Sequence, residues 1–314
     1  MAIFTGMSKA LGGTEKESQK ELYFYGLVQQ HVLVTGGDGQ LGCALRALIG
    51  KMNLPFRFYF TDAGELDITD RSQIESFVVG QQIRYILNCA AYTAVDKAEE
   101  EREMAFTINA AGVENIALVA KQYGVKVIHL STDFVFDGAS TIPYDEESEP
   151  HPLSVYGETK LKGEQLLQAA GGEWLILRTS WLYSEYGSNF VKTMLRLMRE
   201  RELLTVVDDQ RGSPTYATDL AEMMIHILQQ SEANGWTNGL FHFSNRGQTS
   251  WYGFADAIRR VAGIENCKLV PVTTAEYPTA ARRPAYSVMD LTKISDRFRV
   301  EIPTWEEALQ RCLQ

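Results

Sequence analysis

The chain has few cysteines, only four among 314 residues. A disulfide framework needs a denser set, and zinc or redox sites need close pairs such as CxxC, which this chain lacks. We therefore expect isolated, buried thiols that act as small hydrophobic side chains in a reducing cytoplasm, and we predict no metal site. The four are Cys43, Cys89, Cys267 and Cys312.

The chain also lacks a long apolar run and an excess of positive charge. No segment approaches the roughly 20 apolar residues of a transmembrane helix, and the opening "MAIFTGMSKALGGTEKESQK" lacks the basic-then-apolar layout of a signal peptide. The net charge of −10 argues against a general nucleic-acid or anionic-membrane binder, although it allows a local basic pocket for a phosphorylated small molecule. We expect a cytoplasmic protein with no nucleic-acid or membrane partner.

From residue 31 the sequence has the rhythm of alternating strands and helices. Apolar runs such as "HVLVT", "FRFYFT" and "VKVIHL" alternate with segments of helical period, notably residues 97–123. Strands that are apolar on both faces predict an α/β fold with a doubly wound, Rossmann-type parallel sheet. We expect an extension of unknown structure at 1–30, this domain at 31–180, and a smaller mixed α/β domain at 181–314 that returns some elements to the first.

The first strand is followed by "TGGDGQLG", which places Gly36, Gly39 and Gly42 at the start of a helix. Glycines with this spacing permit a tight turn, close approach of the backbone to a pyrophosphate and close helix–strand packing, and the helix N-terminus supplies amide donors. A structural turn is the alternative. We predict an NAD(P)-binding turn that includes Gln40 and Leu41.

Two carboxylates follow the second strand. Asp62 ends that strand about twenty residues after the glycines, where an acidic side chain binds ribose hydroxyls in dinucleotide folds. A carboxylate also repels a 2′-phosphate, so we favour NADH over NADPH. For Asp67, contact with the adenine end and capping of a helix that begins near Asp70 are both open.

The segment "SVYGETK" places Tyr156 and Lys160 four positions apart, and therefore on one side of a helix. A tyrosine can protonate the oxygen of a ketone as hydride arrives, if its pKa is brought down from about 10. We expect the ammonium of Lys160 to lower that pKa and to bind the nicotinamide ribose.

A hydroxyl that orients the carbonyl is expected from "HLSTDFVFDG", since Ser131 and Thr132 end the fourth strand at the ligand-binding edge of the sheet. Tyr156 and Lys160 alone could be the aromatic and solvated residues of an amphipathic helix. Combined in this order with the glycine turn and Asp62, they favour a ketoreductase.

At this point the chain resembles the extended short-chain dehydrogenase/reductase family and, within it, the dTDP-4-dehydrorhamnose reductases. The resemblance runs from residue 31 almost to the end. It implies NADH- or NADPH-dependent reduction of the C4 keto group of dTDP-4-dehydro-β-L-rhamnose to dTDP-β-L-rhamnose, a precursor of surface polysaccharide. The motifs that carry it are "VTGGDGQLG", "NCAAYTAVDKAE", "INAAGVENIA", "STDFVFDG", "YGETKLKGE", "RTSWLY", "DDQRGSPTYATDLA" and "ARRPAYSVMD".

The resemblance also implies roles for individual residues. It makes Thr132, Tyr156 and Lys160 the catalytic set and places the family's helix asparagine at Asn109. The residues that it places against the cofactor are Ala90, Ala91 and Tyr92. The residues that it places against the nucleotide-sugar are Thr132, Asp133, Trp181, Asn189, Gln210 and Arg283.

Several of these residues have simpler explanations. The two alanines could serve close packing, Asn109 could satisfy a buried polar partner, and Trp181 could be a core residue. In the loop that holds Gln210, Gly212 and Pro214 could form a plain turn. Arg283, rather than Arg282, is our choice for the diphosphate, because a guanidinium suits paired phosphate oxygens.

Three questions stay open in the sequence. Some members of the family form magnesium-bridged homodimers through acidic residues that have no match here, so dimerisation and magnesium dependence are undecided. The sugar could be a different nucleotide-activated one. A non-catalytic regulatory subunit, like the dinucleotide-binding partner protein of methionine adenosyltransferase, is the alternative from another class, and the Thr132, Tyr156 and Lys160 set argues against it.

Overall fold

The computed structural model describes residues 29–314. The expected extension at 1–30 falls almost entirely outside these residues. The elements up to the fifth strand are β1 (Gln30–Thr35), α3 (Gln40–Ile49), β2 (Phe56–Thr61), α4 (Arg71–Gly80), β3 (Tyr85–Asn88), η1 (Lys97–Glu99), α5 (Arg102–Phe106), η2 (Thr107–Ala111), α6 (Gly112–Tyr123), β4 (Lys126–Thr132), η3 (Asp133–Val135), α7 (Val155–Ala170) and β5 (Glu173–Thr179).

These strands form a six-stranded sheet in the order β10-β5-β4-β3-β1-β2, where β10 spans Gly239–His242. Every neighbouring pair in it is parallel. The chain runs outward from β1 to β2, then crosses back to β3 on the other side, so the point of reversal lies beside β1. This confirms the predicted doubly wound α/β fold, and such folds bind ligands at that edge of the sheet.

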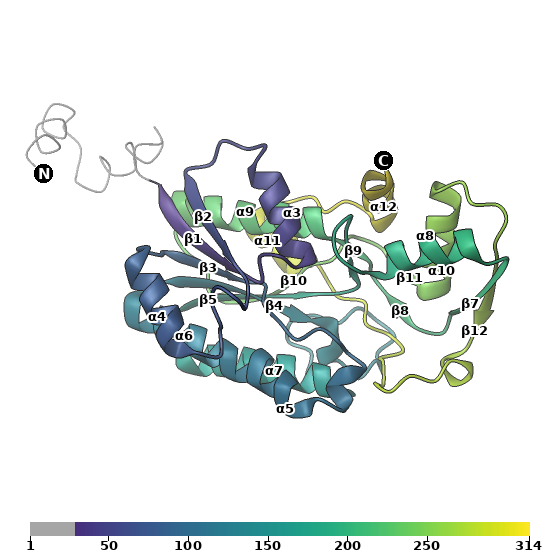
Figure 1. Cartoon of the computed structure of the whole chain (residues 1–314), viewed down its shortest axis with the longest axis horizontal. Helices are drawn as coiled ribbons and strands as arrows, with labels where there is room; N and C mark the ends of the chain where they lie inside the picture. The colour runs from purple at the N-terminus through teal and green to yellow at the C-terminus, as the bar shows by residue number, and fades with distance from the viewer. Residues whose placement is uncertain (1–28) are drawn as a thin grey trace, which may run out of the picture.

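Alternate residues of each strand enter two separate cores, one on each face of the sheet. In β1, Val32 and Val34 pack on the face covered by α3, whereas Leu33 packs on the opposite face with α4, α6 and α7. The helices accordingly form a layer above and a layer below the sheet (Figure 1). Burial on both faces is the physical reason that the strands read as continuous apolar runs.

The predicted helical stretch at 97–123 consists of four pieces rather than one helix. A π-helical turn, η2, lies between α5 and α6 and contains the buried Asn109. The backbone of this turn touches α7 closely, because a Cβ at Gly163 would lie 2.2 Å from the carbonyl oxygen of Asn109. A π turn inserts one extra residue and so redirects a side chain.

The later half of the chain supplies a second lobe, which lies beside the sheet in Figure 1. Its core joins α8, α10 and α12 to a two-stranded sheet of β7 and β12, with Phe254, Ile258 and Leu309 at its centre. The remaining elements are β6 (Leu182–Tyr183), α8 (Phe190–Glu200), β7 (Leu203–Val207), β8 (Arg211–Gly212), β9 (Thr215–Tyr216), α9 (Ala217–Asn234), β11 (Thr249–Ser250), α10 (Trp251–Val261), β12 (Lys268–Val272), η4 (Thr274–Glu276), α11 (Thr292–Phe298) and α12 (Trp305–Leu313).

Three later elements pack onto the large sheet instead. Strand β10 extends the sheet beside β5, and α9 and α11 contribute Leu220, Met224 and Ile294 to the core above it. The two lobes are thus joined by several crossings of the chain. No helix among residues 29–314 is long and apolar enough to cross a membrane.

Candidate active site

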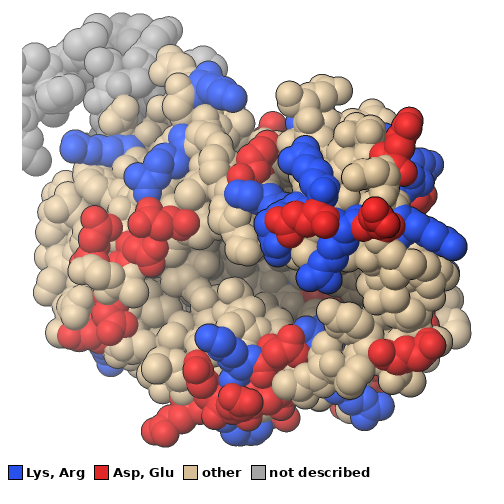
Figure 2. Space-filling view, turned by 45° about the vertical axis from the view of Figure 1, so that its right-hand side comes forward, with Lys and Arg blue, Asp and Glu red and all other residues tan. Residues whose placement is uncertain are grey.

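A cavity of about 890 Å³ opens between the large sheet and the second lobe. Figure 2 shows it as a hollow whose floor is largely uncharged, with charged side chains around its rim. The cavity brings together most of the predicted site residues. Those that line it are Gly36, Gly39, Gln40, Leu41, Gly42, Asp62, Asp67, Ala90, Ala91, Thr132, Asp133, Tyr156, Lys160, Trp181, Asn189 and Arg283.

The glycine turn forms one end of the cavity and leaves no room for side chains. Gly36 has φ +65°, and a Cβ on it would lie 2.8 Å from the backbone of Ala90. A Cβ on Gly42 would lie 2.4 Å from the carbonyl oxygen of Gly37. Helix α3 begins directly after Gly39 without a side-chain cap, so its first amides remain available to an anion.

Asp62 and Asp67 lie on the loop that leaves β2, where both side chains border the cavity. Asp62 accepts a hydrogen bond from the amide of Ala63 at 2.8 Å. Asp67 accepts from both the amide and the hydroxyl of Thr69 at 2.8 Å. The cap of α4 is Asp70, whose carboxylate accepts from the amide of Ser72, so the alternative that Asp67 caps this helix is wrong.

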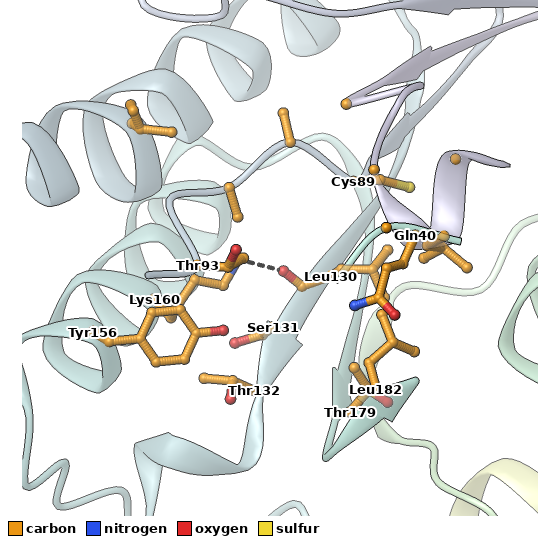
Figure 3. A pocket seen from close by; sticks show the side chains of 18 of the residues that line it. Gln40, Cys89, Thr93, Leu130, Ser131, Thr132, Tyr156, Lys160, Thr179 and Leu182 are labelled. Atoms are coloured by element: carbon orange, nitrogen blue, oxygen red, sulfur yellow. Dashed lines mark hydrogen bonds between the residues drawn. The ribbon is translucent and has the colours of Figure 1, made fainter. Parts of the chain in front are cut away.

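Tyr156 and Lys160 project from α7 toward the end of β4, as Figure 3 shows. The ammonium of Lys160 donates to the carbonyl oxygen of Leu130 at 2.6 Å. Burial lowers the pKa of Lys160 to about 8, and the carboxylate of Glu164 and the thiol of Cys89 oppose that shift.

In this structure the pKa of Tyr156 is raised, whereas the sequence predicts that Lys160 lowers it. Burial raises the pKa of Tyr156 to about 12, opposed by a hydrogen bond with Thr132 and reinforced by the charge of Asp133. Burial is the largest cause, and Lys160, which donates to a backbone carbonyl, is not among the groups that shift this pKa. Tyr156 therefore stays protonated at neutral pH, which is the form that a proton donor requires.

The end of β4 carries a hydroxyl and a carboxyl beside this tyrosine. The Thr132 hydroxyl donates to Asp133 at 3.1 Å and accepts from the amide of Phe134 at 3.2 Å. Asp133 is fully buried, and burial raises its pKa to about 6, with hydrogen bonds from Ser287 and Thr132 opposing the shift. Its Oδ2 has no hydrogen-bond partner among residues 29–314.

Beneath them, a buried ion pair ties α7 to the sheet. The guanidinium of Arg178 donates twice to Glu164, from Nε at 2.9 Å and from Nη2 at 2.7 Å. The Ser131 hydroxyl donates to the same carboxylate. This network fixes the helix that carries Tyr156 and Lys160 against strands β4 and β5, because an unpaired buried charge is costly.

The loop after β3 carries Ala90 and Ala91 along the cavity wall. Tyr92 does not line the cavity; its hydroxyl donates to Glu101 instead. Asn109 holds this loop, since it accepts from the amide of Tyr92 at 2.8 Å and donates to the carbonyl of Tyr92 and the hydroxyl of Thr159 at 3.0 Å. Asn109 thus satisfies buried polar groups and is absent from the cavity lining.

Gln40 and Asn189 connect the glycine turn to the second lobe. The Asn189 side chain caps α8, accepting from the amide of Lys192, and its Nδ2 donates to the Gln40 side-chain oxygen at 2.9 Å. The hydroxyl of Ser184 donates to the same oxygen at 3.1 Å. The sequence predicts that Gln40 binds the cofactor and Asn189 the nucleotide-sugar. In the structure both line the cavity and are hydrogen-bonded to each other.

Gln210 lies behind the cavity wall and does not line it. It is buried, and its side chain joins the indole nitrogen of Trp251 at 3.1 Å to the hydroxyl of Thr274 at 3.0 Å. Trp251 itself lines the cavity and stacks on Trp181. Sequence reasoning missed Trp251, whose only signal is an aromatic residue after "QTS" at the start of a helix.

Arg283 reaches the cavity from the C-terminal segment and is bound to a carboxylate there. Its guanidinium donates to Asp96 from Nη1 at 3.0 Å and from Nη2 at 2.6 Å, and the hydrogen bonding from Arg283 lowers the pKa of the Asp96 carboxyl. The amide of Ala281 also donates to Asp96. The pair joins the loop after β3 to the C-terminal segment across the cavity mouth.

Within residues 29–314, no group of three histidine, cysteine, aspartate or glutamate side chains is arranged to hold a metal ion. All four cysteines are free. Cys89 lies in the cavity wall, and burial raises the pKa of its thiol to about 12. A thiol of that acidity is not a nucleophile at neutral pH.

Comparisons with known proteins agree with this geometry. Residues 30–314 match the family described as "RmlD substrate binding domain". A dTDP-4-dehydrorhamnose reductase of Aggregatibacter actinomycetemcomitans is 43% identical over 89% of this chain and 97% of its own length. The spore coat polysaccharide biosynthesis protein SpsK of Bacillus subtilis is 38% identical over 90% of this chain and 96% of its own length.

A solved structure is similarly close. The crystal structure of dTDP-4-dehydrorhamnose reductase from Bacillus anthracis in complex with NADP has a TM-score of 0.84 and 40% identity, covering 91% of this chain and 99% of that one. The likeness therefore extends over both lobes and the cavity between them.

Proposed function

The chain belongs to the dTDP-4-dehydrorhamnose reductase family, and from that premise we propose that it reduces the C4 keto group of dTDP-4-dehydro-β-L-rhamnose to dTDP-β-L-rhamnose with NADH or NADPH. The observation that carries this proposal is the meeting of Tyr156, Thr132 and Lys160 with the glycine turn in one cavity. The shared names of relatives that match nearly the whole chain support the nucleotide-sugar as substrate.

The cavity fits a dinucleotide at the glycine turn. Any side chain at Gly36 or Gly42 would collide with the backbone, and the open N-terminus of α3 offers amides to a pyrophosphate. The bound cofactor supplies the hydride. Asp62 favours NADH, because a carboxylate repels a 2′-phosphate, and the guanidinium of Arg46 near this turn is already paired with Asp38 at 3.3 Å.

The residues of the chain then handle the oxygen of the substrate. The phenol of Tyr156, which burial keeps protonated, donates its proton to the oxygen that was the ketone. Thr132, on the same edge of the sheet, holds that oxygen through its hydroxyl. Lys160 supplies a positive charge near the phenolate that remains and binds the nicotinamide ribose.

The nucleotide-sugar occupies the other half of the cavity in this proposal. Trp181 covers the apolar face of the deoxyhexose, and Arg283 exchanges Asp96 for the diphosphate, which offers the same paired oxygens to a guanidinium. Asp133 and Asn189, which both line the cavity, contact the sugar in this proposal. A different nucleotide-activated sugar is the second candidate, which the similarity to SpsK favours.

The test is turnover with defined sugars. Purified protein is given enzymatically generated dTDP-4-dehydrorhamnose with NADH or NADPH, and cofactor oxidation is followed by absorbance while the product is identified by NMR. We expect dTDP-rhamnose, with higher kcat/KM for NADH. Cofactor binding without oxidation for this sugar or for other 4-keto nucleotide-sugars contradicts the proposal and favours the regulatory-subunit alternative.

A further inference from the structure

Two stacked indoles form the wall of the cavity on the side of the second lobe. Trp181 follows β5 and Trp251 begins α10, and their rings lie 3.5 Å apart between centroids at an angle of 6°. Phe190 packs against the outer ring, with 4.7 Å between its centroid and that of Trp251. We call Trp181 and Trp251 the indole stack. Both members line the cavity.

The backbone of Trp181 is strained. Its φ is +47°, in the left-handed region that residues with a side chain seldom adopt. Neighbouring bonds hold it there, since the carbonyl of Trp181 accepts from the amide of Thr215 at 3.2 Å and the Ser180 hydroxyl donates to the carbonyl of Ser213 at 2.6 Å. Such strain persists where the surroundings over-determine it, and it is concentrated at binding sites.

Gly212 leaves the space that the indole of Trp181 occupies. A Cβ at this position would lie 2.6 Å from Cε2 and 2.7 Å from Nε1 of that ring. Real Cβ atoms do not approach so closely, so any side chain at 212 displaces the indole. The glycine is required by this contact and not by its own φ, which lies outside the left-handed range.

The outer ring of the stack is held from behind by hydrogen bonds. The indole nitrogen of Trp251 donates to Gln210 at 3.1 Å, and Gln210 donates to the Thr274 hydroxyl at 3.0 Å. Gln210 is buried, whereas Thr274 at the end of this chain of bonds is exposed, so the middle of the chain is the part that is shielded from water. Trp251 therefore has a fixed ring plane against which Trp181 packs.

We propose that Trp251, Gln210 and Gly212 are positioning residues that hold the strained Trp181 as a preformed wall for the apolar face of the sugar. The inference rests on the proposed function and deepens it, since it explains how the sugar side of the cavity is built. A preformed ring binds with less loss of side-chain freedom than a mobile one. Without the stack and the bare glycine, Trp181 relaxes toward an unstrained backbone and the wall is lost.

The experiment compares Trp251→Leu and Gly212→Ala with two reference variants. Trp251→Phe keeps an aromatic ring, and Gly80→Ala makes the same chemical change at a glycine with nothing within 4 Å of the added Cβ. KM and kcat for dTDP-4-dehydrorhamnose, NADH affinity and the near-ultraviolet circular dichroism of the stacked indoles are measured for each.

We expect KM to rise about tenfold in Trp251→Leu and Gly212→Ala, as the loss of an aromatic pair predicts. NADH affinity and kcat stay close to wild type, because the glycine turn and Tyr156 lie elsewhere. Trp251→Phe recovers the part of the loss that ring stacking supplies, but not the part that the bond from the indole nitrogen to Gln210 supplies. In Gly212→Ala both tryptophans remain, so loss of the coupled indole signal reports displacement of the ring without any need for turnover. Gly80→Ala keeps both the signal and KM.

An unchanged KM in Trp251→Leu, or an intact indole signal in Gly212→Ala, overturns the inference. So does an equal fall in NADH affinity, which indicates general damage to the fold. Wild-type protein that binds NADH but does not oxidise it with this sugar contradicts the proposed function instead, and the dichroism of Gly212→Ala still tests the positioning.

Discussion

The two halves of the cavity are built in different ways, and each is named for the ligand that we propose it binds. The cofactor half is made of backbone, in a single turn between Gly36 and Gly42, where the lack of side chains is what admits a ligand. The sugar half is made of side chains from distant segments, such as Trp181 against Trp251 and Arg283 against Asp96. A backbone site is broken by one added methyl group, whereas a side-chain site depends on the residues behind it.

Among the changes that separate the two halves, the largest expected effect breaks the cofactor half alone. In Gly42→Ala the new Cβ would lie 2.4 Å from the carbonyl oxygen of Gly37, so the turn must shift. We expect NADH affinity to fall about 100-fold, which is the upper range of an overpacking penalty. Fluorescence titration with NADH measures it, and Gly80→Ala is the matched control. Unchanged affinity in Gly42→Ala means that this turn does not hold the cofactor.

The next effect tests whether the buried carboxyl of Asp133 in the sugar half lowers the free energy of unfolding. Burial raises the pKa of Asp133 to about 6, while an aspartate in the unfolded chain has a pKa near 3.9. Below about pH 3 the carboxyl is protonated in both states. As pH rises from there to about 6, the unfolded chain releases its proton first, so the native state loses stability.

Asp133→Asn removes this charge, so we expect it to increase the free energy of unfolding at pH 7 by about 3 kcal/mol. The gain should shrink to about 0.5 kcal/mol at pH 4. Urea unfolding at both pH values measures the difference. A gain of equal size at both pH values contradicts the account, because it cannot come from ionisation of the carboxyl.

A smaller effect sharpens the cofactor half. Asp62→Asn removes the carboxylate that disfavours a 2′-phosphate, and we expect the NADPH-to-NADH ratio of kcat/KM to rise about tenfold, which corresponds to one charge at moderate screening. Glu65→Gln is the control, since it changes a carboxylate of the same loop that does not line the cavity. Equal ratios in the two variants rule out a special role for Asp62.

The smallest effect is the change of kcat with pH, which depends on Lys160 of helix α7. Burial lowers the pKa of Lys160 to about 8, so its positive charge is lost as pH rises through that value. We expect kcat to fall by about half near pH 8 and further above it, because in the proposed mechanism the ammonium assists Tyr156. In Lys160→Arg the charge persists, so this limb of the pH profile should move upward. If kcat of Lys160→Arg declines at the same pH as kcat of the wild type, the decline comes from another group and not from Lys160.

The sequence predicts the cofactor half well, because a contiguous motif specifies it. The strand, the glycine spacing and Asp62 are local features, and the apolar runs follow from burial of both sheet faces. The helical spacing of Tyr156 and Lys160 also predicts that both side chains point to the same side, and both line the cavity. The spacing does not predict the partner of the Lys160 ammonium, which donates to the carbonyl oxygen of Leu130 on β4.

The sugar half is harder to predict, because its contacts join residues far apart in the chain. Nothing local to Asp96 indicates that it pairs with Arg283, and nothing local to Gln210 indicates that it lies behind Trp251. The left-handed backbone of Trp181 runs against its own local preference and is imposed by tertiary contacts. Such residues emerge only once the two lobes are assembled.

The most direct test of the central claim is Tyr156→Phe, compared with wild type for NADH oxidation by dTDP-4-dehydrorhamnose and for NADH affinity. We predict that kcat falls about 1000-fold, in the range expected for loss of a positioned proton donor, while NADH affinity is unchanged because the glycine turn is intact. Equal turnover by the two proteins would contradict the account, since the cavity would then reduce the sugar without its tyrosine.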